Sequence, residues 1–536
     1  MKRLLLSLSA AAALWSAACG GGNSIVTPPP PVGKYSTASL NGTYAFVSSG
    51  EVFASGAATA TPLARSGSFS ANGTGGITGG IEDVVEPGVL PNLAIPITGG
   101  SYTVNADGRG TLTLNLTAAG VPSSINFGIV LTSTSDGLLI DETSTSAQAS
   151  TGSGNFIKQN SSSFASPVLP VTASYVFDFS GLDGNAAPDS LVGEFTAGSG
   201  AITAGFEDAN DNFSITSGTI PPGTLTQDPA NPTTLTQFGR GTAQIAGETY
   251  VFYIVDSTRL RFISTGGGAM LSGDAVIQTN TIPANVSAVN SSFAFLVAGS
   301  SGSGGMTRVG RFTANGATVT NVLQDTNDAG KFILTNSTTA ASISLDPANP
   351  GRGTFTFTDP NFASAPSTFV FYLSSATQGV IQEQTMNNNL GAVNVADGTI
   401  AAQTGSPFSS GNITGTYAIS WSGLSVQTGS GFSLQDEEDL LGEVTVSGLA
   451  LNGAADIFQF QSGAPAADLV ASGSIIINGD GTSSSSAARN TMSVKLTQSN
   501  SVTVNFVVYF VSPQLAFFTN NQDANRTVAG VLTTQQ

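Results

Sequence analysis

The chain is built from short segments in which apolar residues alternate with small or polar ones, the two-residue period of a strand with one buried face. In the first 160 residues eight such segments follow one another, at 43–47, 67–71, 76–81, 100–104, 110–116, 126–132, 137–142 and 154–158. Gly, Asn and Asp fill nearly every gap, because tight hairpins need residues that tolerate a positive φ. No window after the N-terminal segment has a convincing helical period. The pattern predicts an antiparallel meander.

This meander recurs four times along the chain. A strand–turn–strand motif with an acidic end appears at 66–83, 192–211, 309–328 and 441–456. The aromatic residue of the opening strand recurs at intervals of 131, 118 and 124 residues, as Tyr44, Tyr175, Phe293 and Tyr417. Each copy closes on a glutamine: Gln159, Gln278, Gln403 and Gln535. Because so long a period implies whole domains, we expect β-repeats at 40–160, 161–280, 281–404 and 405–536.

Two features bear on the architecture of each repeat. Pairing the first strand with the last would close a barrel and remove its exposed edges, and the Gly42-Thr-Tyr44 pattern resembles the first strand of lipocalin-like barrels. The sixth strand, at 250–255, 369–373 and 506–511, is apolar on both faces, so either the domains pack on one another through it or each is a sandwich with extra cover. We expect an all-β chain of four tandem antiparallel domains of about eight short strands each. An up-and-down β-barrel is favoured, and a β-sandwich is the alternative.

The N-terminus has the pattern of an export signal. A basic start, Met1-Lys-Arg3, is followed by an apolar run at 4–15 and by Ser16-Ala-Ala-Cys19. This segment resembles the signal peptide and lipobox of bacterial lipoproteins, with Ser16 in place of the usual aliphatic residue. The pattern predicts a signal peptide at 1–18, and the resemblance implies a lipid on Cys19 and attachment to a membrane. The prolines at 28–31 predict an extended, Pro-rich linker within 19–39. Gly20 after the cysteine implies the outer membrane or cell surface.

Composition removes several classes of function. A net charge of -18 argues against nucleic acid as a partner, since phosphates are bound by basic patches. The chain has no histidine, and Cys19 is its only cysteine, which excludes Ser-His-Asp and Cys-His catalysis and disulfides within the chain. We therefore do not expect an enzyme, and a polysaccharide-cleaving activity ranks third among the functions considered.

The acidic ends of repeats two and three are candidate cation sites. Oxygen-bearing side chains stand close together there, as in loops that bind hard cations. The candidate ligands of a weak Ca²⁺ site are Asp208, Asn210, Asp211, Asp325, Asn327 and Asp328. The alternative is a turn in which these side chains bond to their own backbone. No other cofactor is expected.

A Gly-Arg-Gly-Thr motif recurs in three repeats and supplies candidate ion pairs. Its arginines are Arg109, Arg240 and Arg352. Guanidinium pairs with carboxylate through a bidentate fork, so we predict that they pair with Asp83, Asp208 and Asp325 of their own repeats. Repeat four has Gly479-Asp-Gly-Thr482, which indicates loss of the arginine. The acidic run at 435–439 is interpreted as a solvated hairpin tip.

The favoured function is a structural or adhesive role: a string of domains, such as a stalk, that projects from the cell surface. The alternative is a binding protein that holds a small apolar ligand or a glycan in or on its β-domains. A glycan or a surface protein is the expected partner in either case.

Overall fold

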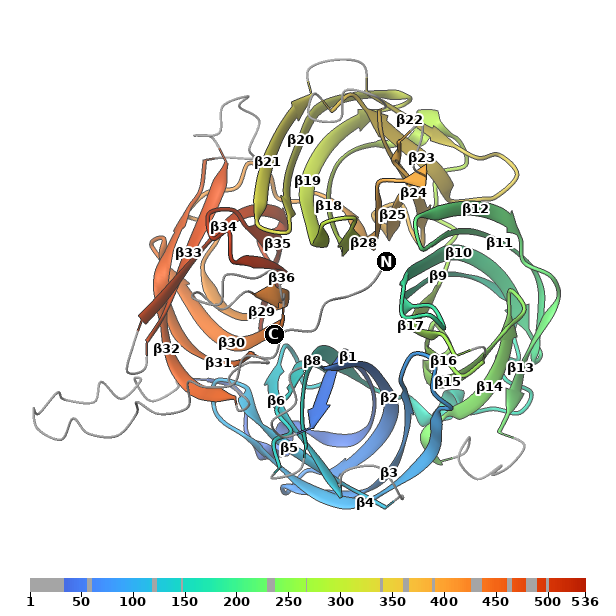
Figure 1. The fold of residues 1–536 in the computed structure, drawn as a ribbon, viewed down its shortest axis with the longest axis vertical. Coiled ribbons are helices and arrows are strands. Elements are labelled where there is room, and N and C mark those ends of the chain that lie inside the picture. Colours follow the sequence, from blue (N-terminus) through green and yellow to red (C-terminus); the bar gives the residue numbers. More distant parts are fainter. Residues whose placement is uncertain are drawn as a thin grey trace, which may run out of the picture.

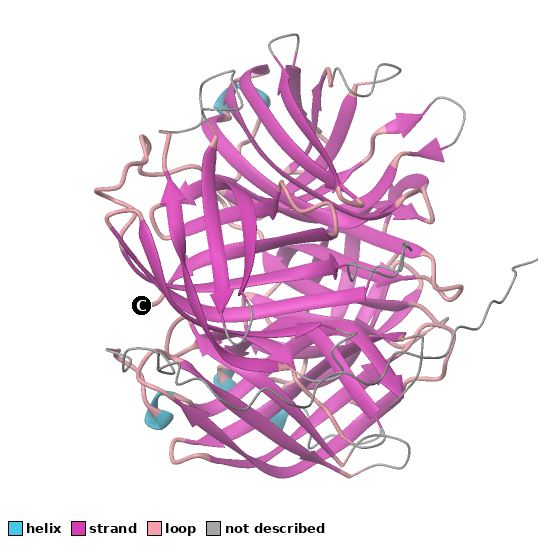
Figure 2. Ribbon diagram, turned by 60° about the vertical axis from the view of Figure 1, so that its left-hand side comes forward, coloured by secondary structure: helices cyan, strands magenta, loops and turns pink. Residues whose placement is uncertain are grey.

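The computed structural model of the chain describes residues 33–54, 60–117, 123–145, 148–228, 237–266, 268–337, 341–359, 366–387, 391–425, 436–459, 465–478, 489–497 and 501–536. Within them the regular structure is overwhelmingly β-strand (Figure 2). Short 3-10 helices precede the first three repeats' opening strands, η1 at Thr37–Ser39, η2 at Ser161–Ser163 and η3 at Val286–Ala288. The predicted all-β class, with four closed antiparallel barrels in tandem, is confirmed.

Barrel 1 is an up-and-down barrel of eight strands. Each strand pairs with the next, and β1 pairs with β8 to close the sheet. Its strands are β1 Asn41–Ala54, β2 Thr61–Asn72, β3 Gly76–Val85, β4 Asn92–Val104, β5 Arg109–Leu116, β6 Ser124–Leu131, β7 Asp136–Asp141 and β8 Gln148–Lys158. The pairing of the first strand with the last is the feature that distinguishes a barrel from the alternative of a β-sandwich.

Barrels 2 and 3 have the same plan with one broken strand. In barrel 2 the β10–β11 pairing closes the sheet, and β12 and β13 pair with opposite ends of β11, so together they replace the single β4. The strands of barrel 2 are β9 Ala173–Leu182, β10 Pro188–Gly198, β11 Ala201–Asp211, β12 Ser214–Thr219, β13 Gly223–Gln227, β14 Arg240–Ile245, β15 Glu248–Asp256, β16 Arg259–Ser264 and β17 Met270–Ile277. Those of barrel 3 are β18 Asn290–Ser301, β19 Gly304–Asn315, β20 Thr318–Asp328, β21 Lys331–Ser337, β22 Ala341–Leu345, β23 Arg352–Phe357, β24 Ser367–Leu373, β25 Gln378–Glu383 and β28 Asn394–Ala402, with a small hairpin, β26 Met386–Asn387 and β27 Gly391–Ala392.

Barrel 4 returns to the uninterrupted plan and is closed by β29 and β36. Its strands are β29 Gly415–Ser425, β30 Asp436–Ser447, β31 Ala450–Gln459, β32 Ala466–Ile476, β33 Asn490–Thr497, β34 Ser501–Ser512, β35 Leu515–Asn520 and β36 Arg526–Thr534.

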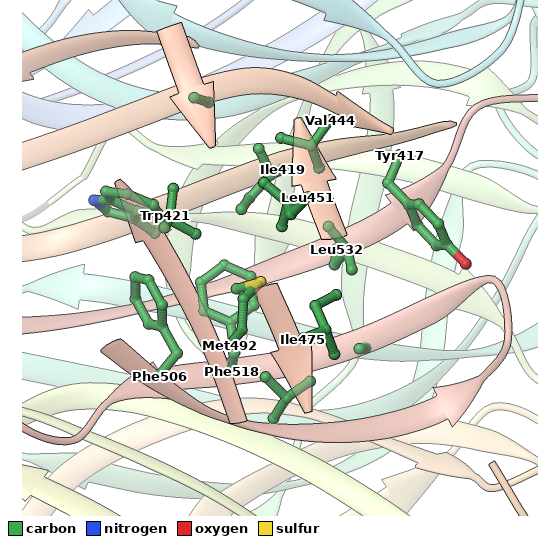
Figure 3. Packing of buried hydrophobic residues seen from close by; sticks show 14 of the residues in the cluster. Tyr417, Ile419, Trp421, Val444, Leu451, Ile475, Met492, Phe506, Phe518 and Leu532 are labelled. Atoms are coloured by element: carbon green, nitrogen blue, oxygen red, sulfur yellow. The ribbon is translucent and has the colours of Figure 1, made fainter. Parts of the chain in front are cut away.

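The barrel interiors are filled by the chain's own side chains. In barrel 4, Trp421 and Phe506 pack with ring centroids 5.1 Å apart, and Phe506 and Phe518 are 4.8 Å apart, within a cluster of buried aliphatic residues (Figure 3). In barrels 1 and 3 an aromatic ring packs directly over the glycine of Gly67-Ser-Phe69 and of Gly310-Arg-Phe312. A Cβ at Gly67 would lie 2.5 Å from the Phe46 ring, and one at Gly310 would lie 2.4 Å from the Phe295 ring.

The four barrels lie side by side in a closed ring, with barrel 4 next to barrel 1 (Figure 1). The chain is therefore a ring of domains, which corrects the predicted string or stalk. The ring also decides between the two explanations of the doubly apolar sixth strand. In β15, β24 and β34 one face lines the barrel and the other packs against the preceding barrel, so the domains pack through this strand.

Candidate functional site

The most regular feature outside the barrel interiors is the junction between neighbouring barrels. Four junctions, named 1–2, 2–3, 3–4 and 4–1 after the barrels that they join, have apolar centres built from the first strands of one barrel and the sixth and seventh strands of the next. At junction 1–2 the apolar centre consists of Val251, Tyr253 and Val255 on Ala45, Ala64 and Ile81, and at junction 2–3 of Val370 and Tyr372 on Val176 and Val192. At junction 3–4 it consists of Val507, Tyr509 and Val511 on Ala294, Val309 and Leu323, and at junction 4–1 of Val130 and Ile140 on Ala418 and Leu441. Every interface is thus of the head-to-tail kind, and the rotation closes.

At junction 1–2 a buried carboxylate of barrel 1 accepts three hydrogen bonds from barrel 2. Arg240 of barrel 2 binds Asp83 of barrel 1 through both carboxylate oxygens, at 2.9 and 2.7 Å, and Tyr253 donates to the same group at 2.5 Å. Asp228 also accepts from Arg240. A carboxylate with this many charge-assisted bonds fixes both the position and the orientation of the neighbouring barrel.

The same triad recurs at the next two junctions. Arg352 of barrel 3 binds both oxygens of Asp208 in barrel 2, at 2.7 and 2.8 Å, and Tyr372 donates at 2.5 Å. Burial raises the pKa of Asp208, but the bonds from Arg352, Ser217 and Tyr372 outweigh it and leave the pKa below its usual value. At junction 3–4, Asp325 accepts from Arg489 at 2.9 Å and from Tyr509.

The predicted pairing within each repeat is wrong, because each arginine pairs with the aspartate of the preceding repeat. Arg240 binds Asp83 instead of Asp208, and Arg352 binds Asp208 instead of Asp325. The motif sits at the start of the fifth strand, which the ring turns toward the preceding barrel. The predicted loss of the arginine from repeat four is also wrong, since Arg489, the residue before β33, takes the role. It is flanked by Ala488 and Asn490 instead of glycines, so the motif did not reveal it.

Junction 4–1 completes the ring with a different set of polar contacts. Arg109, predicted to pair with Asp83, binds Asp107 at 3.0 Å and Asp468 of barrel 4 at 2.9 Å, and lies 3.7 Å from Asp456. Val130, opposite Arg109 in the β5–β6 register, occupies the place that Tyr253 has opposite Arg240. This junction therefore has no tyrosine at that position of the triad.

The glutamine that ends each repeat is a second recurring junction contact. Gln159 donates to Ile254 O at 2.6 Å, Gln278 to Leu373 O at 3.1 Å, Gln403 to Phe510 O at 2.6 Å, and Gln535 to Leu131 O at 2.9 Å. The last of these runs from barrel 4 back to barrel 1. Gln535 and its neighbour Gln536, which donates its backbone N–H to Thr132 O at 2.8 Å, anchor the C-terminal end on barrel 1.

The candidate calcium ligands lie at the ends of β11 and β20, and most of them make junction contacts. Asn210 donates to Asn394 O at 2.7 Å, and Asn327 donates to Asn520 Oδ1 at 2.6 Å, both across a junction. Asp328 accepts from Ser301 at 2.5 Å, and Asp211 is exposed. No group of three or more acids, cysteines or histidines placed to hold a metal occurs among the residues that the structure describes. Calcium binding by these residues stays a prediction.

Two junctions contain carboxyl groups on strand faces whose pKa is raised. At junction 2–3 burial, and then the charges of Asp397 and Asp274, raise the pKa of Asp178, while burial raises that of Asp397 to about 6. At junction 4–1 burial raises the pKa of Asp439 to about 7, and Asp439 accepts from Thr151 of barrel 1 at 2.7 Å. The run at 435–439 is therefore not a solvated tip, since its second half lies buried on β30.

Comparisons with known proteins give little. No protein-family model and no curated protein matches the chain. Transferrin-binding protein B of Haemophilus parasuis is 10% identical over 79% of this chain and 86% of that chain, with a TM-score of 0.19. The isotype 1 protein of Neisseria meningitidis is 10% identical over 74% of this chain and 84% of that chain, with a TM-score of 0.20. At these scores the likeness supports no conclusion.

The lipidation site lies outside the described residues, which begin at 33, so Cys19 stays a prediction. Within the described part of the chain, none of the helices has the length and apolar character needed to cross a membrane.

Proposed function

We propose that this chain is a non-catalytic, lipid-anchored module on the outside of the cell, with a structural or adhesive role. The observation that carries the proposal is the closed ring. Arginine, tyrosine and glutamine contacts recur from junction to junction, and the C-terminal residues bind barrel 1. A ring closed in this way leaves no end barrel with an unpaired face and holds its surface hairpins in a fixed array, which suits a surface module.

The packed interiors favour the surface over the barrel lumen as the functional part. Aromatic rings of the same barrel touch, as Phe312 and Phe355 do at a centroid distance of 4.1 Å. The alternative of a small apolar ligand held inside a barrel gains no support from such an interior. A glycan or a surface protein bound on the outside of the ring remains the proposed partner.

The anchor is tested by labelling. Cells that express the full chain are fed an alkyne-tagged fatty acid, and the Cys19→Ala variant is the control. We expect lipid label and membrane fractionation for the natural chain and neither for the variant. Equal labelling of both, or labelling of neither, would refute the anchor, whatever the ring does.

The surface role is tested on the same two strains. A non-adherent host that displays the natural chain should attach to arrays of immobilised glycans and extracellular proteins, or should gain resistance to envelope stress, and the host with Cys19→Ala should do neither. A host that is unchanged in attachment and in envelope resistance would contradict the proposal.

A further inference from the structure

The hairpin between β3 and β4 of barrel 1 presents a group of apolar side chains to solvent. Leu90 is 89% exposed, Val89 is 52% exposed and Leu93 is 43% exposed. Among the residues that the structure describes, the other exposed large apolar side chains stand alone in the sequence: Val171, Leu334, Met386, Ile476 and Val502. Single exposed apolar residues are ordinary on a protein surface, whereas a contiguous group of them marks an interaction site.

The tip of this hairpin is held in place by barrel 2. The Gly88 N–H donates to Gly268 O, in the turn between β16 and β17, at 2.9 Å. A Cβ at Gly88 would lie 3.3 Å from Gly184 O, in the turn between β9 and β10, so the hairpin touches two turns of barrel 2. Val89 and Leu90 follow directly after this contact. They are therefore presented on a fixed segment, which reduces the entropy that a partner loses by binding there.

Acidic side chains surround the apolar tip. Glu86 stands at the base of the hairpin, and Asp183 is the residue before Gly184. Glu248 lies beside the second contacting turn, since a Cβ at Gly266 would be 3.4 Å from its Oε2. All three acids are at least partly exposed. We call Val89, Leu90 and Leu93, with Glu86, Asp183 and Glu248, the hairpin surface.

The hairpin surface and the start of the described chain lie at opposite ends of barrel 1. The Tyr35 N–H donates to Ala106 O, in the turn between β4 and β5, at 3.3 Å, and the Tyr35 hydroxyl donates to Thr132 O, which follows β6, at 3.1 Å. In an up-and-down barrel, the turns after even-numbered strands lie at one end and the turns after odd-numbered strands at the other. With the proposed anchor, the hairpin surface therefore points away from the membrane.

The charge of the hairpin surface is not balanced by cations of the chain itself. Each arginine in the described part of barrels 1 and 2 has an acidic partner within the molecule: Arg65, Arg109, Arg240, Arg259 and Arg261. The lysines of these barrels, Lys34 and Lys158, stand at the other end of barrel 1. A second copy of the chain or an anionic membrane would bring like charge to this place, whereas a cationic partner is complementary to it.

We propose that the hairpin surface docks a protein partner through a segment in which apolar side chains alternate with lysine or arginine. The apolar side chains of that segment pack on the three apolar residues of the hairpin, with Leu90 as the main contact, and its cations lie beside the three acids. The inference rests on the proposed surface role and names the chemistry of the protein that is bound there.

The test is a titration of the ectodomain, residues 33–536, into a fluorescent peptide of alternating leucine and lysine, followed by fluorescence anisotropy. A serine–lysine peptide and a leucine–glutamate peptide of the same length are the matched ligands. We expect saturable binding of one leucine–lysine peptide per chain, about tenfold tighter than that of the serine–lysine peptide. The leucine–glutamate peptide should not bind. Affinity for the leucine–lysine peptide should fall as salt is added, because salt screens exposed charges.

Four variants locate the site. Leu90→Ser should weaken binding of the leucine–lysine peptide about tenfold, as removal of a main interface contact does. Glu248→Gln should weaken it by a smaller factor. The matched controls are Leu334→Ser, an exposed leucine of barrel 3, and Asp256→Asn, at the opposite end of β15 from Glu248, and both should bind like the natural chain. Absence of saturable binding, or equal affinity in Leu90→Ser and Leu334→Ser, would overturn the proposal.

The other possible occupants of the hairpin surface are tested by sedimentation of the ectodomain, alone and with phosphatidylcholine vesicles. The natural ectodomain should stay monomeric and should not sediment with the vesicles. Self-association or vesicle binding that Leu90→Ser removes would identify a second copy or a lipid surface as the occupant, and would overturn the proposal.

The attachment assay separates this inference from the proposed function. A host that displays Leu90→Ser should lose attachment to immobilised proteins and keep the lipid label on Cys19. Undiminished attachment by this host would refute the hairpin surface as the docking site and leave the surface role intact. If the natural chain confers no attachment, the surface role fails, and the peptide titration decides the hairpin surface by itself.

Discussion

At the scale of single residues, the junction aspartates do the most to position the barrels. Asp83 has no exposed surface and accepts from Arg240 and Tyr253 of the next barrel. A charge buried so deeply is tolerated only with its partners in place, and removing one partner leaves the others unpaired.

Asp83→Ala should therefore destabilise the ectodomain by about 3 kcal/mol, the usual cost of breaking a buried ion pair. Urea denaturation at pH 7 measures it. Asp456→Ala at junction 4–1 is the matched comparison and should cost less, because Arg109 lies 3.7 Å from Asp456 and keeps Asp107 and Asp468. Equal costs for the two variants would contradict this ranking of the junctions.

The sequence identified the junction residues but not their pairing. Arg240, Arg352, Asp83 and Asp208 stood out as recurring charges in a chain with few charges. Since every repeat carries both members, an arginine can satisfy its own repeat's aspartate or its neighbour's without any change in sequence. Only the placement of one barrel against the next decides which aspartate each arginine binds. That placement depends on contacts between residues that are far apart in the sequence.

At the scale of strands, the faces that meet at junction 2–3 contain a pH-sensitive pair. Asp178 on β9 and Asp397 on β28 both have raised pKa values, with that of Asp397 about 6. Asp274, held by Arg259 and Arg261, and the hydroxyls of Ser180 and Ser190 are the other groups that face them. Such acids hold protons in the folded state that the unfolded chain releases near pH 4, so stability falls as pH rises through about 6.

Asp397→Asn should make stability less dependent on pH. We expect the natural ectodomain to lose on the order of 1–3 kcal/mol more than the variant between pH 5 and pH 8. Thermal denaturation across this range measures the slope. Asp183→Asn is the control, because its turn hydrogen bonds lower the pKa of Asp183 and keep it ionised throughout. An unchanged slope in Asp397→Asn would show that the pair does not titrate there.

The terminal glutamine is the element-scale contact that closes the ring. Deleting residues 535 and 536 removes the bonds from Gln535 to Asp107 O and Leu131 O and from Gln536 to Thr132 O. Hydrogen exchange should then rise on β6 of barrel 1 and on β29 of barrel 4 and stay unchanged at junction 2–3. Unchanged hydrogen exchange on β6 and β29 of the shortened chain would mean that the two terminal residues do not hold junction 4–1 together.

Most strands could be predicted, because alternation and turn residues mark them locally. The division of the fourth strand of barrel 2 into β12 and β13 could not be predicted, since the residues on both sides of the break still alternate. The acidic run at 435–439 misled for a related reason. A carboxylate in a sequence normally indicates an exposed position. Glu438 is nevertheless buried, and its partners Arg526, Trp421 and Gln459 lie outside the acidic run.

At the scale of the whole molecule, the ring brings the two ends of the described chain together. The Tyr35 hydroxyl donates to Gln536 O at 2.8 Å. Neighbouring termini on a closed fold permit the chain to be joined there and opened elsewhere.

A circular permutant tests this consequence. A short Gly/Ser linker joins Gln536 to Tyr35, and new termini are placed between β17 and β18, in the connection at 278–289. We expect a folded monomer with thermal stability within a few degrees of the natural ectodomain. The control is the natural chain order carrying the same linker at its end. If the control folds but the permutant aggregates or loses cooperative unfolding, the two ends do not lie together in a closed ring.

Tandem duplication was evident from the sequence, but the ring was not. The doubly apolar strand indicated lateral packing, and the glutamines marked the end of each repeat. Neither feature sets the angle between barrels, and only that angle distinguishes a ring from a row.

Small-angle X-ray scattering of the ectodomain, residues 33–536, tests the ring most directly. A compact chain of this length should have a radius of gyration of about 23–26 Å. An extended row of four barrels would give a value of about 35 Å or more. The compact value, unchanged between low and high salt, is the predicted result, and the extended value would contradict the ring.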